Sequence, residues 1–238
     1  MKWLLVIFMI ISSLWAEKTV IVGVGLSLEP YIIKKNNTGI ELDIVKTALQ
    51  KAGYQVRVKY LPFLRIPLYL KDKKIDAATT INENSGIKNV FYSDKDIYYQ
   101  NVVVTLKSRH LDIKKVSDLK GLRVIGFQNS DKYLGKKFRE VIPKLKFYQE
   151  LANQRLQVKL LFAHRVDAII LDVNIFKYIR QHLKDVNTKQ KVAIFETFPK
   201  TYYKVGFLDK NVRDKYNKAL RKMKKNGECD KIFKKYIK

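Results

Sequence analysis

The sequence is poor in cysteine and histidine, and this limits the chemistry that it can perform. Its only cysteine, Cys229, cannot form a disulfide within the chain, so the fold relies on a packed core. The three histidines, His110, His164 and His182, lie far apart and lack the paired spacing of a metal site. A glycine-rich phosphate loop and a nucleophile elbow are also missing from the sequence. We therefore expect no metal, no cofactor and no catalytic nucleophile.

Acidic residues are scarce as well, since 22 Asp and Glu stand against 48 Lys and Arg and leave a net charge of +26. An excess of this size suggests a protein that binds nucleic acid or another anionic surface. However, the positive charge is spread along the chain, and no Arg-rich tail or low-complexity arm concentrates it. Phosphate binding normally uses a patch or a stripe. A diffuse solvated surface is therefore the favoured interpretation, and we expect no nucleic-acid partner.

The first residues are typical of a secretory signal. Met1 and Lys2 precede an apolar run from Trp3 to Ile11, and Ala16 offers a small residue for cleavage. The run is too short to span a bilayer, which takes roughly 20 apolar residues. We predict that residues 1–16 are a signal peptide and that the mature protein lies in the periplasm.

Hydrophobic residues make up 47% of the chain, and their periodicity predicts an α/β protein. The first part alternates strands at 20–25, 56–60 and 77–80 with helices at 40–52 and after Pro62. A second unit has strands at 123–127, 146–148 and 168–171, again with helices between them. Strands that alternate with helices imply right-handed crossovers and parallel sheets.

Two extended runs, at residues 97–105 and 202–207, connect these units. The helical stretch that follows the second run is too short for a domain, so we expect it to pack back on the first unit. This organisation predicts two lobes with a cleft between them. Lobe 1 would comprise residues 17–101 and 203–238 and lobe 2 residues 106–198, with a two-strand hinge at 97–105 and 199–203.

Polar side chains end two of the predicted strands. Asp172 follows the buried run at 168–171, and ligands of open α/β sheets bind beyond the carboxyl ends of such strands. Asp172 is equally suited to cap the helix that follows, and the two roles are compatible. Thr79 and Thr80 end a strand of the first unit and can hydrogen-bond a ligand, although threonine is also simply a good strand former.

Six short motifs follow one another in order: Gly39-Ile-Glu-Leu-Asp43, Lys74-Ile-Asp76, Phe91-Tyr-Ser93-Asp94, Asp118-Leu-Lys-Gly121, Arg165-Val-Asp167-Ala168, and Asn226-Gly227 ahead of a run from Ile232 to Tyr236. Together they resemble the family 3 periplasmic solute-binding proteins, the two-lobed type II receptors of polar amino-acid ABC transporters. The resemblance covers the whole chain after the signal. It implies a monomeric, hinged receptor without covalent chemistry, which closes over a small polar solute and has an inner-membrane ABC permease as its partner.

The resemblance also implies roles for individual residues. In members that bind amino acids, an aromatic at the position of Tyr31 stacks on the ligand, and the acid at the position of Asp172 takes the ammonium group. Groups around Thr79 and Thr80 share the polar contacts. In the second lobe the usual Gly-Thr pair is replaced by Asn129 and Ser130, which we predict to contact the ligand.

One expected residue is missing. The arginine that clamps the ligand α-carboxylate in this family has no counterpart in residues 81–88, where Lys88 is the nearest cation. A guanidinium grips a carboxylate bidentately and lysine does not. Arg65, within a Pro-aromatic-x-Arg element that resembles divergent members, is a candidate substitute, with a solvated surface arginine as the alternative. Because Asp172 is present and the carboxylate clamp is missing, we predict a small polar solute, amino acid or amine-like, that bears an amine or several hydroxyl donors.

Three other functions stay open. A ligand sensor for a membrane kinase or chemoreceptor has the same sequence features as a transport receptor. A periplasmic cyclohexadienyl dehydratase would need a positioned acid, and Glu29, Glu41 and Asp172 are candidates without a motif in support. The third is the basic nucleic-acid binder. We favour the receptor and predict that the protein is not an enzyme.

Overall fold

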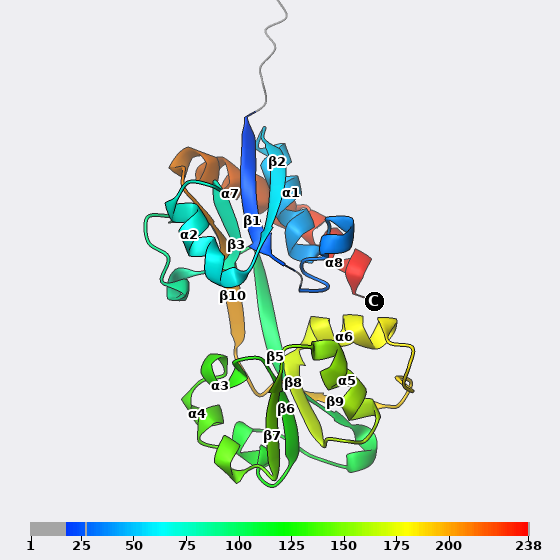
Figure 1. Cartoon of the computed structure of the whole chain (residues 1–238). Helices are drawn as coiled ribbons and strands as arrows, with labels where there is room; N and C mark the ends of the chain where they lie inside the picture. Colours follow the sequence, from blue (N-terminus) through cyan, green and yellow to red (C-terminus); the bar gives the residue numbers. More distant parts are fainter. Residues whose placement is uncertain (1–17, 27, 238) are drawn as a thin grey trace, which may run out of the picture.

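Two long strands, β5 (Ile97–Leu106) and β10 (Lys200–Phe207), run between two lobes (Figure 1). The computed structural model describes residues 18–26 and 28–237, so the predicted signal peptide lies outside the described residues. Among the described helices, none has the length and apolar content needed to cross a bilayer. The predicted lobe boundaries stay a prediction, and the two lobes are defined below by their elements.

Lobe 1, the upper one in Figure 1, is built from both ends of the described chain. Its elements are β1 (Thr19–Gly25), α1 (Ile40–Lys51), β2 (Gln55–Leu61), α2 (Ile66–Lys71), β3 (Ala77–Ile81), β4 (Phe91–Tyr92), α7 (Lys210–Lys225) and α8 (Glu228–Tyr236). Lobe 2 contains β6 (Arg123–Phe127), α3 (Ser130–Tyr133), α4 (Lys136–Arg139), β7 (Phe147–Leu151), α5 (Gln154–Phe162), β8 (Ala168–Asp172), α6 (Val173–His182) and β9 (Val192–Phe195).

The strands form one hydrogen-bonded path in the order β2-β1-β3-β10-β5-β8-β6-β7, with β4 on β10 and β9 on β5. In lobe 1, β1 is parallel to β2 and to β3, and in lobe 2, β6 is parallel to β7 and to β8. The predicted α/β class and its two parallel units are confirmed. The strands β5 and β10 are antiparallel to their neighbours and join the two units into one mixed sheet.

The core of lobe 1 lies under α1, which packs against α7 and α8. The apolar stripe of α1 is completely buried, as is the facing stripe of α7, and one cluster of buried side chains runs from these helices along β5 into lobe 2. A second cluster fills lobe 2 below α4, and a third lies under α2. The C-terminal helices α7 and α8 therefore pack on α1 of the first unit.

The loop before α1 depends on Gly39. This residue has a φ of +135°, and a Cβ atom there would lie 2.3 Å from the carbonyl oxygen of Tyr31. The close approach lets that carbonyl accept the amide of Glu41 at 3.2 Å, while the Pro30 carbonyl accepts the amide of Ile40 at 2.9 Å. Loop carbonyls thus satisfy the first amides of α1, which has no side-chain cap. The same contacts fix the position of Tyr31.

The observed boundaries differ from the predicted ones at several elements, and three of these differences have a clear physical cause. Strand β7 extends to Leu151, because its last residues pair with the end of β6. Helix α5 accordingly starts at Gln154, where the side chain of Asn153 caps it by accepting the amide of Leu156 at 3.1 Å. The C-terminal stretch is two helices, because Gly227 adopts a φ of +75° between α7 and α8.

Candidate functional site

Asp172 lies where β8 ends and α6 begins, and its side chain is 2% exposed. Its Oδ1 accepts the amides of Asn174 at 2.9 Å and Ile175 at 3.0 Å, so the interpretation as a helix N-cap is confirmed. Its Oδ2 accepts the amide of Gln100, on β5, at 2.8 Å. The carboxylate therefore ties the start of α6 to a strand that runs into lobe 1.

The loop of lobe 1 delivers a further hydrogen bond to the same carboxylate. The hydroxyl of Tyr31 donates to Asp172 Oδ1 at 2.9 Å and accepts from the Asn174 amide nitrogen Nδ2 at 2.9 Å. The ring of Tyr31 is fully buried and stacks on Tyr99, with centroids 4.2 Å apart. The predicted stacking of Tyr31 on a ligand stays a prediction, since its ring packs on the protein in this structure. Tyr31 and Asp172 form a direct contact between the two lobes.

Burial determines the protonation of this contact. It raises the pKa of Asp172, while hydrogen bonds from Ile175, Gln100 and Tyr31 oppose the shift. Burial, followed by the charge of Asp172, holds the pKa of Tyr31 well above its usual value. The phenol therefore stays protonated and donates, and the carboxylate is surrounded by donors from three elements.

Thr79 and Thr80 lie in β3 inside lobe 1, ahead of its last residue Ile81, and are also buried. Thr80 has a φ of +57°, an uncommon left-handed conformation for a β-branched residue. Its hydroxyl donates to Glu41 Oε2 at 2.7 Å and lies 3.3 Å from the hydroxyl of Thr79. The two predicted residues thus lie beside a buried carboxyl group of α1.

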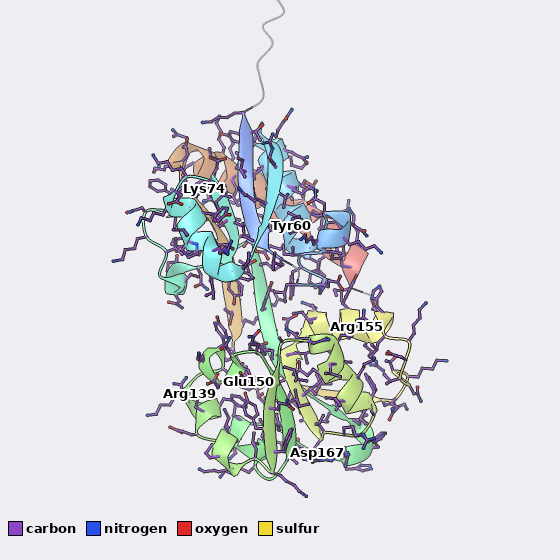
Figure 2. The ribbon with its side chains drawn as sticks, in the orientation of Figure 1. Tyr60, Lys74, Arg139, Glu150, Arg155 and Asp167 are labelled. Carbon is purple, nitrogen blue, oxygen red and sulfur yellow. The ribbon has the colours of Figure 1, made fainter. Side chains whose placement is uncertain are left out.

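Asn129 and Ser130 lie together at the start of α3, where Glu150 of β7 holds them. The carboxylate of Glu150 accepts the amides of Asn129 at 2.7 Å and Asp131 at 2.9 Å, and the hydroxyls of Ser130 at 3.2 Å and Tyr148 at 2.8 Å. Ser130 is completely buried. Figure 2 shows Glu150 near the end of lobe 2 that faces lobe 1. The first amides of α3 are therefore satisfied by the protein's own carboxylate.

The two candidate cations lie apart from these groups. Arg65 is exposed on the short helix at 63–65, and Lys88 is exposed on the segment after β3. Neither side chain makes a hydrogen bond or an ion pair with the residues that the structure describes. Both are thus available to a ligand, and their role stays a prediction. Within residues 18–26 and 28–237 no group of three or more histidine, cysteine or acidic residues is arranged to hold a metal.

Comparison with protein-family models identifies the family of this chain. The model of the bacterial extracellular solute-binding proteins, family 3, matches residues 20–238. The chain belongs to this family. The resemblance drawn from the six motifs is therefore confirmed, and the fold is that of the type II amino-acid-binding proteins.

Several relatives of this solute-binding protein are known. The arginine-binding extracellular protein ArtP of Bacillus subtilis (strain 168) is 25% identical over 232 residues, which cover 93% of this chain and 87% of ArtP. The L-cystine-binding protein TcyA of the same organism is 27% identical over 237 residues, 95% of this chain and 85% of TcyA. An ancestral arginine-binding protein bound to arginine has a similar structure, with a TM-score of 0.66, 27% identity, and coverage of 92% of this chain and 97% of that one.

Two acids of this solute-binding protein were not predicted as ligand-site or supporting residues, although the sequence contains a signal for each. Glu41 shares a helical face with Ile44, Val45 and Ala48, which indicates that it is buried. Glu150 lies two residues after Tyr148 on the same face of β7. The amide of Gln100 left no signal, because a backbone group is independent of residue type.

Proposed function

We propose that this protein captures a small amine-bearing solute, an amino acid or a close analogue, between its two lobes and delivers it to an ABC permease. The observation that carries the proposal is the buried Tyr31–Asp172 hydrogen bond, which joins the lobes through a carboxylate suited to an ammonium donor. Curated relatives named for arginine and for cystine support the solute class.

In this proposal the ammonium group of the solute donates to Asp172 in place of the Tyr31 hydroxyl, and the strands β5 and β10 act as the hinge of closure. Asp172 keeps its amide donors from Asn174, Ile175 and Gln100 throughout, so its charge stays balanced. Arg65, which has no partner among the described residues, is the cation that we assign to the carboxylate of an amino-acid solute.

Calorimetric titration tests this function. The panel comprises arginine, lysine, glutamine and cystine, a diamine without a carboxylate, and a dicarboxylate without an amine. We expect an amine-bearing compound to bind best and Asp172→Asn to weaken it roughly tenfold to a hundredfold, since a charge-assisted hydrogen bond contributes about 1.5–3 kcal/mol. The matched control is Asp167→Asn at the opposite end of β8, which should leave affinity unchanged. Tightest binding of the dicarboxylate, undiminished in Asp172→Asn, would contradict the proposal.

The same samples test the alternative of a dehydratase. Glu41, a candidate acid whose pKa is raised to about 8 by burial, is completely buried and contacts Thr80, so it reaches no solute in this structure. We expect no conversion of prephenate or arogenate. Formation of phenylpyruvate or phenylalanine that disappears in Glu41→Gln would favour the enzyme instead.

A further inference from the structure

Four buried polar atoms inside lobe 1 lack a hydrogen-bond partner among the residues that the structure describes. They are Oε1 of Glu41, Oδ2 of Asp96 and the hydroxyls of Tyr99 and Tyr216. These residues come from α1, from the segment before β5, from β5 itself and from α7, four elements that meet in the core of the lobe. A buried polar group without a partner costs free energy, so four of them together call for an explanation.

The charge of Asp96 acts on the carboxyl group of Glu41. Burial raises the pKa of Glu41 to about 8, and the nearby Asp96 adds to the shift. Burial raises the pKa of Asp96 to about 7, against the hydrogen bonds of its own amide and that of Ile97 and the charge of Lys224. Two carboxylates placed together in a dry core cannot both ionise without strong repulsion.

The surroundings offer little to balance a negative charge. From the neighbouring elements, the charge of Lys224 on α7 lowers the pKa of Asp96. The pair in turn raises the pKa of five groups around it, which are Tyr216 of α7, Cys229 of α8, Tyr99 of β5, Tyr203 of β10 and Tyr31 of the loop before α1. Only Lys224 is cationic. The two nearest phenols, Tyr99 and Tyr216, keep their protons, because burial holds the pKa of each well above its usual value.

A proton bound by one of the two carboxyl groups would reduce the repulsion between them and supply a hydrogen-bond donor. One protonated carboxyl group supplies a donor where two carboxylates would supply only acceptors, and the phenols add two further donors. We propose that Glu41 and Asp96 form a buried proton-binding site that controls the hinge between the lobes. The proposal does not depend on which solute the protein binds.

The pair is connected to the hinge strands by hydrogen bonds. Oδ1 of Asp96 accepts the amide of Ile97, the first residue of β5, at 3.0 Å, and the amide of Asp96 donates to the carbonyl of Tyr203, on β10, at 3.1 Å. A charge on Asp96 that is repelled by Glu41 therefore acts directly on the point where both connecting strands leave lobe 1.

The pair is also connected to the residues that join the lobes. Oε2 of Glu41 accepts a hydrogen bond from the hydroxyl of Thr80, whose backbone is left-handed. The neighbouring Tyr99 stacks on Tyr31, whose hydroxyl reaches Asp172 of lobe 2. Loss of the proton therefore weakens the packing that holds Tyr31 in place on lobe 1. We expect the lobes to lie further apart at high pH.

The sign of the pH dependence follows from linkage. Both acids have a higher pKa in the folded protein than in the unfolded chain, where about 4 is usual, so between these values the folded state binds more protons. Stability is therefore greatest below about pH 4 to 5 as far as this pair is concerned. It declines as the pH rises to about 8, and the pair contributes no further change above that.

Thermal unfolding and small-angle scattering of the full protein test the site between pH 5.5 and 8.5. We expect the melting temperature of wild type to fall and its radius of gyration to rise across this range. Glu41→Gln and Asp96→Asn should each reduce both changes and melt above wild type at pH 8.5. The matched control is Glu140→Gln, an exposed acid of lobe 2, which should behave as wild type.

Carbon-detected titration of the carboxyl signals in wild type gives an answer even if a variant fails to fold. Two carboxyl groups should titrate with midpoints near 7 to 8, far above the ordinary value of about 4. Ordinary midpoints for all acids would overturn the proposal. A radius of gyration that is the same at both ends of the pH range, or that changes equally in wild type and Glu41→Gln, would show that the pair does not control the hinge.

Discussion

Removing the Asp172 side chain should destabilise the protein far more than most single substitutions. In Asp172→Ala, α6 loses its cap, which costs about 1 kcal/mol. The buried amide of Gln100 and the hydroxyl of Tyr31 lose their acceptor, and each adds about 1–2 kcal/mol. The sum is about 4 kcal/mol, a large share of the 5–15 kcal/mol that a folded domain typically has.

Two milder variants show how much each hydrogen bond contributes to the stability that Asp172→Ala loses. Asp172→Asn keeps one oxygen for the cap but turns an amide group toward Gln100, so we expect a loss of about 1–2 kcal/mol. Tyr31→Phe removes only the hydroxyl and should cost about 1 kcal/mol. Because Tyr31 and Asp172 are in contact, the losses of Tyr31→Phe and Asp172→Ala should not add in the double variant.

Urea unfolding followed by circular dichroism measures these free energies, and calorimetry gives the melting temperatures. Asp172→Ala should lower the melting temperature by roughly 8–16 °C, at about 2–4 °C per kcal/mol for a chain of this size. A loss below about 1 kcal/mol for Asp172→Ala, or strict additivity with Tyr31→Phe, would refute the idea of a buried carboxylate that joins the lobes.

Three further substitutions examine the supports of the site by the same unfolding measurements. Gly39→Ala should destabilise by about 3 kcal/mol or more, because its Cβ would overlap the Tyr31 carbonyl at a φ of +135°; a neutral result would mean that the loop can move. Glu150→Ala should cost about 1 kcal/mol and weaken hydrogen-exchange protection at the start of α3, and unchanged protection there would argue against the capping role. The side chain of Arg123 holds the pKa of Asp167 below its ordinary value, so wild type should lose stability as the pH falls below about 4. Asp167→Asn should reduce that acid-dependent loss, and an identical acid profile in both proteins would exclude a contribution from Asp167.

The sheet could be predicted because its signals are local. Short buried runs such as residues 168–171 appear as strands wherever they pack, and Gly53 marks the end of α1 through its positive φ. The last residues of β7 and the first residue of α5 were harder to predict from the sequence. The pairing of Leu151 with Phe127 depends on a strand that lies 24 residues away. Boundaries set by a distant partner leave little trace in the local sequence.

The sequence predicted several residues of the candidate site but not the contacts between them. The position of Asp172 at a strand end followed from topology, but its bond to Tyr31 joins residues 141 positions apart. The burial of Glu41 was encoded in the helical period of α1, whereas its neighbour Asp96 lies in a loop and carries no periodic signal. Contacts between residues that lie far apart in the sequence could therefore be found only in the structure.

The return of the chain to lobe 1 through β10 also affects how the protein is made. Helix α1 precedes lobe 2 in the sequence, yet its buried face is covered by α7 and α8, which are synthesised only after lobe 2. Lobe 2 is continuous in sequence and can fold first, while the N-terminal part of lobe 1 must wait with its apolar surface uncovered. Premature termination before Lys210 would therefore release a chain with a complete lobe 2 and an exposed, aggregation-prone lobe 1.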